Sequence, residues 1–535
     1  MRYYYVVIPI LLCALLAPSH VSSQYNYRQE FKEVASYIYN EVGPAFDMVT
    51  VYVMREPEFA DPPLPAWAFD PTIGPNGIAT NCGDTSNGER PGSYAMAGLI
   101  MIRAYWVYLS EGDATTAQNY LDKAKGLGDY LVYNNNNVFI GSCGMSKAGV
   151  GRVTPGSTPS LSATWTMADQ GQAISFLTEL YEVSGDSTYL QAAERIADFS
   201  CDMTGDVFYD PSTGDWYYAA TGTSFPLSKS SPNDTRGIIT LLSSLILLDR
   251  FSANDYSTCI QSLSDKLKDM QKTNGALPRS DASTGDEVES SAAAIPWAYL
   301  RETSSSQDLL NWLLSQQQLD GSFECPNTDS DGSIPGGYKL HDNTERFSRD
   351  QASGSYTLLA LREIASGMDA VDYIIGNLES ATPGAYYDTT DPTHDIYRLG
   401  TAAIGLSLYY AQALNNYTVE GKIFEDLPPN LGVDFTPGED SPLENVTVML
   451  CGVSGGNCDC SIIYDITITD SNGDYILAAP GPGDYCVKVE TDPNWMEPSA
   501  GLNPGYTVSD VKPEQTVECT SAGNCYSEFG GDDPL

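Results

Sequence analysis

Acidic residues stand at the start of several segments that read as buried helices. Asp169, Asp234, Glu289 and Asp350 hold such positions. Glycoside hydrolysis needs one protonated carboxyl to donate to the leaving oxygen and one ionised carboxylate to attack or to activate water. Acids that converge from different helices could do this chemistry, but acids at helix starts also cap free backbone N–H groups. Asp169 and Asp350 are the first catalytic candidates, because each sits beside a glutamine, in D-Q-G-Q-A and D-Q-A-S-G.

Further acids precede the same buried segments, namely Asp84, Glu89, Glu287 and Asp395. A second set, His394, Tyr397 and Arg398, lies in H-D-I-Y-R. It suggests the proton abstraction of a polysaccharide lyase, beside the plainer reading of a histidine bonded within its loop. Lyase substrates are polyanions, which a chain with 70 Asp and Glu against 27 Lys and Arg should repel. A lyase is therefore the second enzymatic hypothesis.

Two kinds of helix alternate along the chain and must position these acids. Helices rich in Ala, Gly, Ser and Leu are predicted at 92–109, 164–183, 236–248, 290–301, 350–365 and 399–414. Amphipathic helices are predicted at 28–41, 115–133, 187–203, 254–271, 306–318 and 368–379. Links from a buried to an amphipathic helix are short, and links back are long, so the long loops gather on one face.

Six such hairpins closed in a ring make an (α/α)6 toroid with the buried helices inside. The alternative is an open α-solenoid, which needs no catalytic site. One long loop, YDPSTGDWYYAATG, predicts a β-hairpin.

Two stretches resemble known α/α toroids. LNWLLSQQQLDGSF resembles the Q-x-x-D-G-S-W repeat of terpene cyclases and prenyltransferases, with Gln318, Asp320, Gly321 and Phe323 as the matching residues and QKTNG at 271–275 as a degenerate copy. The hairpin MADQGQAISFLTELYEVSGDSTYLQAAERIADF is similar to those of six-hairpin glycosidases and sugar epimerases. The resemblance implies a toroid and carbohydrate chemistry, without choosing a reaction.

The N-terminus predicts export. An apolar run after Arg2 and the small residues before Gln24 read as a signal peptide over 1–23, and no later run is long enough to span a membrane. A net charge of −43 argues against nucleic-acid partners. Of the 12 cysteines, all but Cys13 remain after cleavage of the signal peptide, which favours disulfides and one unpaired thiol, with Cys82 and Cys143 able to staple two long loops. Sequons at Asn233, Asn416 and Asn445 are available for glycosylation.

The pattern changes after the last helix. Alternating Val, Ile and Tyr broken by Gly, Pro and Asp turns predict a small all-β, immunoglobulin-like sandwich over 417–535 with a cysteine-rich tail. G-K-I-F-E-D, G-E-D-S-P-L-E-N-V-T-V, T-D-S-N-G-D-Y-I-L and P-G-D-Y-C-V-K-V resemble SdrD B-like, or Cna B-type, domains. That resemblance implies a spacer or adhesion module that contacts cell-surface or matrix components. It also implies a structural Ca²⁺ with four candidate ligands, Asp426, Asn430, Asp434 and Glu439. Asp470, Asn472 and Asp474 also look like a calcium loop, but a hairpin turn is favoured there.

These observations predict a secreted two-domain protein with a toroid over 25–416. The leading hypothesis is a glycoside hydrolase that acts on polysaccharide or oligosaccharide through paired carboxylates. The alternatives are a non-catalytic glycan-binding, adhesion or surface-structure protein, and a polysaccharide lyase or sugar epimerase.

Overall fold

The protein is represented by a computed structural model that describes helices, strands and turns over most of the chain. The described residues are 25–41, 91–133, 149–150, 164–221, 225–280, 286–323, 348–379, 383–386, 398–425, 441–454, 457–481, 483–489, 514–519 and 525–529.

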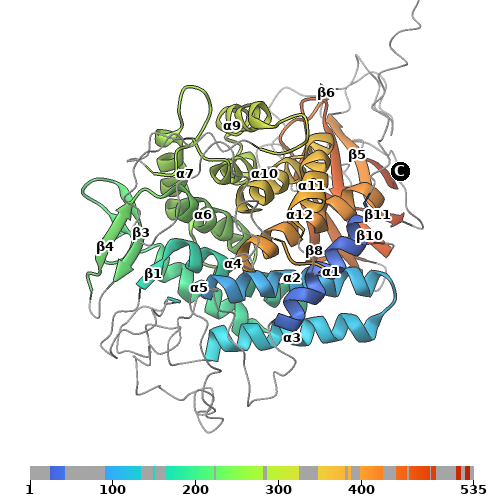
Figure 1. Cartoon of the computed structure of the whole chain (residues 1–535), viewed down its shortest axis with the longest axis horizontal. Coiled ribbons are helices and arrows are strands. Elements are labelled where there is room, and N and C mark those ends of the chain that lie inside the picture. Colours follow the sequence, from blue (N-terminus) through green and yellow to red (C-terminus); the bar gives the residue numbers. More distant parts are fainter. Residues whose placement is uncertain are drawn as a thin grey trace, which may run out of the picture.

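Helices of two kinds alternate, as the sequence predicts. The inner helices are α2 (Pro91–Ser110), α4 (Met167–Ser184), α6 (Thr235–Asp249), the short pair η4 (Glu289–Ala293) and α8 (Ala294–Tyr299), α10 (Ser348–Ala360) and α12 (Arg398–Asn416). The outer helices are α1 (Tyr27–Glu41), α3 (Ala114–Tyr133), α5 (Ser187–Ser200), α7 (Ser257–Met270), α9 (Thr303–Gln316) and α11 (Ile364–Leu378). Each inner helix packs on its outer partner, and α12 packs on α1. Figure 1 shows this arrangement.

The ring is closed. Contacts run from α2 to α4, α6, η4 with α8, α10 and α12, and α12 contacts α2 again. An open solenoid would leave its first and last helices apart, so the prediction of a closed (α/α)6 toroid is confirmed. Small residues allow the inner helices to crowd: a Cβ on Gly171 of α4 would lie 2.6 Å from the carbonyl oxygen of Thr240 in α6. These two helices therefore meet backbone to backbone.

A repeated glycine turn ties each of three outer helices to the next one around the ring. Gly275 and Gly321 have φ of +87° and +86°, and a Cβ on either would lie 2.2 or 2.1 Å from the carbonyl oxygen of Asp308 or Asp369. Gly384 meets the carbonyl of Glu33 at 2.3 Å in the same way. The third contact joins α11 to α1, so this turn also closes the outer ring.

The glutamine of this turn is one residue earlier than predicted. Gln317 Nε2 donates to the carbonyls of Gly321 and Ser366, at 3.2 and 2.8 Å. Gln271 Nε2 makes the same two kinds of bond, to Gly275 and Ser305. Gln318 bonds only locally, to Gln316. The pattern Q-x-x-D/N-G therefore begins at Gln317 and Gln271, and the assignment to Gln318 is wrong.

Among the inner helices, two differ from prediction by a split or by several residues. The fourth inner segment splits into η4 and α8, with Pro296 in the first turn of α8, where its missing N–H costs no helical bond. The fifth inner helix ends at Ala360 rather than 365, because Arg362 turns the chain with a φ of +67° and α11 begins at Ile364.

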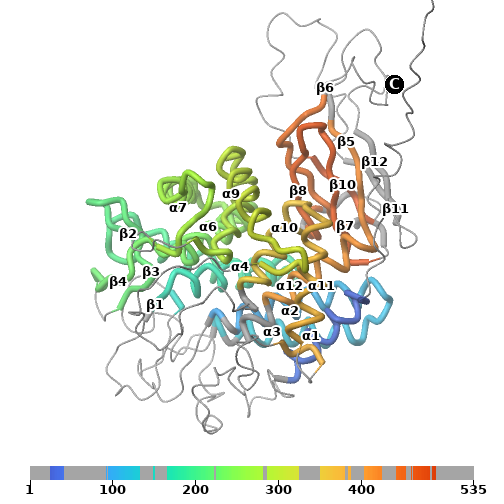
Figure 2. The backbone as a smooth tube through the Cα atoms, turned by 45° about the horizontal axis from the view of Figure 1, so that its top comes forward, coloured from blue at the N-terminus to red at the C-terminus, as the bar shows by residue number. Residues whose placement is uncertain are grey.

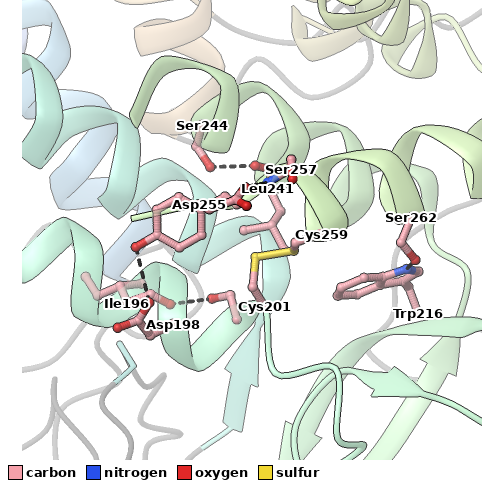
Figure 3. Close-up of a disulfide and its surroundings, with 12 residues drawn as sticks. Ile196, Asp198, Cys201, Trp216, Leu241, Ser244, Asp255, Ser257, Cys259 and Ser262 are labelled. Carbon is pink, nitrogen blue, oxygen red and sulfur yellow. Dashed lines mark hydrogen bonds between the residues drawn. A yellow bond between two sulfur atoms is a disulfide. The ribbon is translucent and has the colours of Figure 1, made fainter. Parts of the chain in front are cut away.

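A β-hairpin forms where one was predicted. Strands β2 (Tyr209–Asp210) and β3 (Asp215–Thr221) pair across the D-P-S-T-G-D turn, and β1 (Thr164–Thr166) and β4 (Ser228–Pro232) pair with β3. Trp216 Nε1 donates to Ser262 Oγ of α7 at 3.2 Å, and Lys266 of α7 pairs with Asp215 at 2.9 Å. The hairpin is therefore fastened to α7. Figure 3 shows this contact beside a disulfide, Cys201–Cys259, that joins α5 to α7.

Strands replace helices after residue 416. One sheet has the order β11 (Glu514–Cys519), β10 (Gly483–Val489), β7 (Thr447–Ser454), β8 (Asn457–Ile468). The other joins β12 (Cys525–Phe529), β5 (Thr418–Glu425) and β6 (Ser441–Pro442), with β9 (Asp474–Ala478) also paired to β5. A disulfide links Cys451 to Cys460. Figure 2 shows β5, β7, β8 and β10 together on one side of the helices.

The strands cover the rear face of the toroid, by which we mean the ends of the inner helices that lead into short turns. Tyr299, at the end of α8, donates to the carbonyl of Ile466 at 2.8 Å. Trp106 of α2 packs edge to face on Tyr464, with ring centroids 4.8 Å apart. Arg362 forms a buried ion pair with Asp465 of β8, whose side chain is 2% exposed. The β-domain is therefore docked on the toroid, not held apart from it as a spacer would be.

Candidate active site

Three of the predicted acids come together at the opposite end of the inner helices, the mouth. Asp234 is the N-cap of α6, Glu289 is the first residue of η4, and Asp350 lies in the first turn of α10. These helices are consecutive in the ring. Thr235 fixes the loop between them, since its N–H and its hydroxyl both donate to the carbonyl of Arg279, and its hydroxyl lies 2.8 Å from that of Ser290.

Two arginines hold the acids. Arg236 Nη2 lies 3.1 Å from Asp234 Oδ2, and its Nη1 lies 3.8 Å from Glu289 Oε2. Arg279 Nε lies 4.0 Å from Asp234. Asp234 also accepts the N–H groups of Arg236 and Gly237, at 3.1 and 3.4 Å. Its carboxylate therefore caps α6 and orients Arg236, which is a positioning role.

Glu287 has the acid–base behaviour that stands out in this cluster. The pKa of its carboxyl is raised to about 7, because burial and the charges of Glu289 and Asp350 together outweigh Arg236 and Arg279, which lower it. Ser290 donates its hydroxyl to Glu287 Oε2 at 3.2 Å. A carboxyl with a pKa near 7 can both give and take a proton at neutral pH. We call Asp234, Arg236, Arg279, Glu287, Glu289 and Asp350 the mouth cluster.

The hairpin contributes an aromatic side to the mouth cluster. The Arg236 guanidinium lies over the ring of Tyr218 of β3, 5.9 Å from its centroid. Tyr218 also packs against the start of α6, where a Cβ on Gly237 would meet its ring at 2.8 Å. Since Trp216 and Asp215 fasten the same strand to α7, the fold fixes Tyr218 beside the acids.

Asp169 has a different environment. Thr166, the N-cap of α4, donates its hydroxyl to Asp169 Oδ2 at 2.6 Å and accepts the N–H of Asp169 at 3.3 Å. The carboxylate is 1% exposed and lies against the start of α2, where a Cβ on Gly92 would come within 2.6 Å of Oδ1. These bonds are those of a capping residue, and the carboxylate lies against α2.

The pattern that Asp169 and Asp350 share has a structural meaning. The next residue in each case, Gln170 or Gln351, makes two hydrogen bonds with a single backbone residue of the preceding loop. Gln170 pairs in this way with Val150, at 2.8 and 2.6 Å, and Gln351 with Phe323, at 2.8 and 3.0 Å. The shared D-Q therefore marks where a long loop is anchored to an inner helix.

Several predicted site residues lie outside the described residues. They are Asp84, Glu89, His394, Asp395, Tyr397, Asp426, Asn430, Asp434 and Glu439. Cys82 and Cys143 also lie outside them. Asp470, by contrast, is described: its Oδ1 accepts the N–H groups of Asn472 and Asp474, at 2.7 and 2.9 Å, which is the predicted hairpin turn.

The sequon at Asn233 is not available in the folded protein. The Asn233 side chain is buried, with the residue 1% exposed, and its amide donates to Asp215 and accepts from the N–H of Trp216. A glycan has no room on such a nitrogen, so the expectation of glycosylation at Asn233 is wrong.

Sequence reasoning missed the cations and the aromatic residue of the mouth cluster. Arg236 stands two residues after Asp234, in N-D-T-R-G, and this local pairing was a usable signal. Arg279 reaches the mouth cluster from a loop and Tyr218 from strand β3, so no spacing in the sequence links them to Asp234. Glu287 stood among the mouth acids, but its neighbours from α6 and α10, which raise its pKa, are set by the fold.

No protein-family model matches the chain, and no curated protein matches its sequence. Solved structures do match. A D-mannose isomerase is similar with a TM-score of 0.50 and 11% identity, over 72% of this chain and 97% of that one. A sugar epimerase from a ruminal bacterium has a TM-score of 0.47 and 13% identity, over 71% and 97% of the two chains. A GH76 α-mannanase from Bacteroides thetaiotaomicron has a TM-score of 0.44 and 13% identity, over 72% of this chain and 96% of that one.

At these identities the likeness to the D-mannose isomerase shows the fold alone, the six-hairpin toroid. In the part of the chain that the structure describes, no helix is long and apolar enough to cross a membrane.

Proposed function

We propose that this protein is a carbohydrate-active enzyme, and that its reaction is the hydrolysis of glycosidic bonds at the mouth of the toroid. One observation carries the reaction: Glu287, with a pKa of about 7, lies among the charged groups Arg236, Glu289 and Asp350. The sugar class of substrate is taken over from the D-mannose isomerase that shares the fold. The tyrosine-rich composition, with 35 Tyr, agrees with it.

The mouth cluster divides the two carboxyl roles by environment. Glu287 is the general acid, since its raised pKa keeps a share of it protonated at neutral pH. Asp350, which comes from the next inner helix, is the ionised partner that attacks or activates water. Glu289 Oε2 lies 3.8 Å from Arg236 Nη1, so it serves as a partner of this cation. Asp169, held by Thr166, is assigned to capping.

The test is an activity screen of the purified mature chain on neutral and uronate-containing polysaccharides. Reducing ends report hydrolysis, and ultraviolet absorbance reports unsaturated lyase products. We expect Glu287→Gln and Asp350→Asn to lower the rate by about 100-fold or more, the usual contribution of a general acid or base. The matched control is Asp286→Asn, which alters the neighbouring carboxylate that pairs with Lys272 at 2.6 Å, outside the mouth cluster. It should keep full activity, and Asp169→Asn should lose less than Glu287→Gln.

Each other outcome points to a definite alternative. Unsaturated products that survive Glu287→Gln and Asp350→Asn would move the chemistry to His394 and Tyr397 and make the protein a lyase. Binding of glycans without any product would overturn the proposal that the protein is an enzyme. It would support the glycan-binding or surface-structure hypothesis.

Two further proposals come from the sequence. Export is proposed from the signal peptide over 1–23, and it predicts that secreted protein begins at Gln24. A structural Ca²⁺ in the β-domain is proposed from Asp426, Asn430, Asp434 and Glu439. Added Ca²⁺ should raise the melting temperature of chelator-treated protein, and Asp434→Asn should abolish that rise.

A further inference from the structure

A cavity of about 490 Å³ lies between the toroid and the β-domain. It is at the rear ends of the inner helices, whereas the long loops are at the mouth. Its toroid side is formed by the ends of α4 and α6 and the turns that follow them, with Tyr181, Glu182, Arg250 and Phe251. Strands β7, β8 and β10 supply the other side. The volume lies within the range of small-ligand sites, and sites of this kind occur preferentially between domains.

The charges around this cavity differ from those of the rest of the chain. Arg250 and Lys488 line it, in a protein whose acids outnumber its Lys and Arg by 70 to 27. Among the described residues, the Arg250 guanidinium makes its hydrogen bond to the thioether of Met449, at 3.6 Å. Sulfur is a weak acceptor, and a guanidinium has five N–H donors. Most of the hydrogen-bonding capacity of Arg250 is therefore left for a ligand.

Two carboxyls act on Arg250 through their charge, those of Asp249 and Glu182, and burial raises the pKa of both. Glu182 accepts the N–H of Ile463, and burial raises the pKa of its carboxyl to about 8. It is therefore largely a neutral acid, which can donate its proton to a hydroxyl. Tyr181 and Phe251 pack edge to face with ring centroids 6.0 Å apart, and they give the cavity an aromatic wall. Such a wall suits the apolar face of a sugar ring.

We propose that this cavity binds a small sugar acid, with the carboxylate on Arg250 and Lys488, the hydroxyls toward Glu182 and the ring against Phe251. The chain's net charge of −43 disfavours long polyanions, but a single carboxylate meets far less repulsion. The site is separate from the mouth cluster, so the proposal does not depend on the reaction proposed there.

The experiment is calorimetric titration of the full mature chain with glucuronate, glucose and glucose 6-phosphate at pH 6.5. Glucuronate should bind at least tenfold more tightly than glucose. Arg250→Met should weaken glucuronate at least tenfold, which is about 1.4 kcal/mol and in the range of a hydrogen bond to a charged group. Circular dichroism checks that the variant folds; if it does not, Lys488→Met replaces it, and Arg250→Lys should retain part of the affinity.

A variant at the mouth serves as the control for binding in this cavity. Glu287→Gln at the mouth should leave glucuronate binding unchanged, and a loss there would place the ligand in the mouth cluster instead. Equal affinity for glucuronate and glucose, or no effect of both Arg250→Met and Lys488→Met, would overturn the site. Glucose 6-phosphate binding more than tenfold tighter than glucuronate would replace the carboxylate with a phosphate as the recognised group.

Discussion

Arginine and carboxylate side chains meet at both ends of the toroid, but in different proportions. At the rear, Arg103 pairs with Glu179 and Arg362 pairs with Asp465, one cation to one acid. At the mouth, Arg236 and Arg279 share Asp234, Glu287, Glu289 and Asp350. Burial alone raises the pKa of Glu179, and its arginine lowers it. The pKa of Glu287 is raised by burial and also by repulsion from neighbouring acids.

The difference separates a structural use of charge from a chemical one. A one-to-one pair under a covering sheet offsets the effect of burial on its acid, and the Arg362–Asp465 pair also fixes one domain on the other. An excess of acids around two cations leaves one carboxyl poised between its two protonation states. The comparison can be tested by changing one end at a time.

The largest effect is expected at the rear face. Arg362→Met leaves the Asp465 carboxylate, 2% exposed, without its cation, and should lower the free energy of unfolding by about 3–5 kcal/mol. Urea denaturation followed by fluorescence measures it. The double variant Arg362→Met/Asp465→Leu should lose much less, because no buried charge is left unpaired. Equal losses in the single and double variants would mean that the pair itself holds the β-domain.

The next largest effect is expected from Gly→Ala substitutions in turns at the two ends of the toroid, which should lose different amounts of stability. Gly321, in a mouth-side turn, has a φ of +86°, and a Cβ added to it would lie 2.1 Å from the carbonyl oxygen of Asp369. Gly185, in a rear turn, has a φ of +69° and open space around it. Gly321→Ala should cost about 3 kcal/mol through strain and clash together. Gly185→Ala should cost about 1 kcal/mol through strain alone. Similar losses would show that α11 moves to make room.

At the mouth, the pKa of Glu287 should respond to its cations. Arg236→Gln removes a charge that lowers this pKa and should raise it by roughly one unit above the wild-type value of about 7. A carboxyl NMR titration measures it directly. A general acid works when protonated, so the rate should fall as the pH rises through about 7, and in Arg236→Gln the fall should move to higher pH. Lys272→Gln, which removes the partner of Asp286, should leave the pH at which the rate falls unchanged. A lower pKa in Arg236→Gln would contradict the assignment.

The toroid could be predicted from the sequence because the pattern of apolar residues in each helix indicates which of its faces are buried. A helix such as 167–184, apolar on several sides, must lie inside, and one such as 187–200, with a single stripe of Leu190, Ala193 and Ile196, must lie outside. Alternation and link length then settle the ring. These are local properties, and the contacts of α12 with α2 and α1 confirm what they predict.

The mouth cluster and the docking of the β-domain could be predicted only in part. Capping acids such as Asp234 reveal themselves by position, but the pKa of Glu287 depends on residues from three helices. Docking depends on isolated residues at the ends of inner helices, such as Trp106 and Arg362, which find partners in β8. Nothing in the local sequence distinguishes these from ordinary helix ends.

The smallest effect concerns the register of the glycine turn. Gln317→Ala leaves the carbonyls of Gly321 and Ser366 without their amide donor and should cost about 1–2 kcal/mol. Gln318→Ala removes one bond, at 3.3 Å, to the nearby carbonyl of Gln316, and should cost less than about 0.5 kcal/mol. Thermal and urea unfolding of the two adjacent variants compare them under one condition. A larger loss in Gln318→Ala would restore the register that the sequence pattern first suggested. Because Ser366 lies at the start of α11, the loss in Gln317→Ala also measures how far one outer helix holds the next.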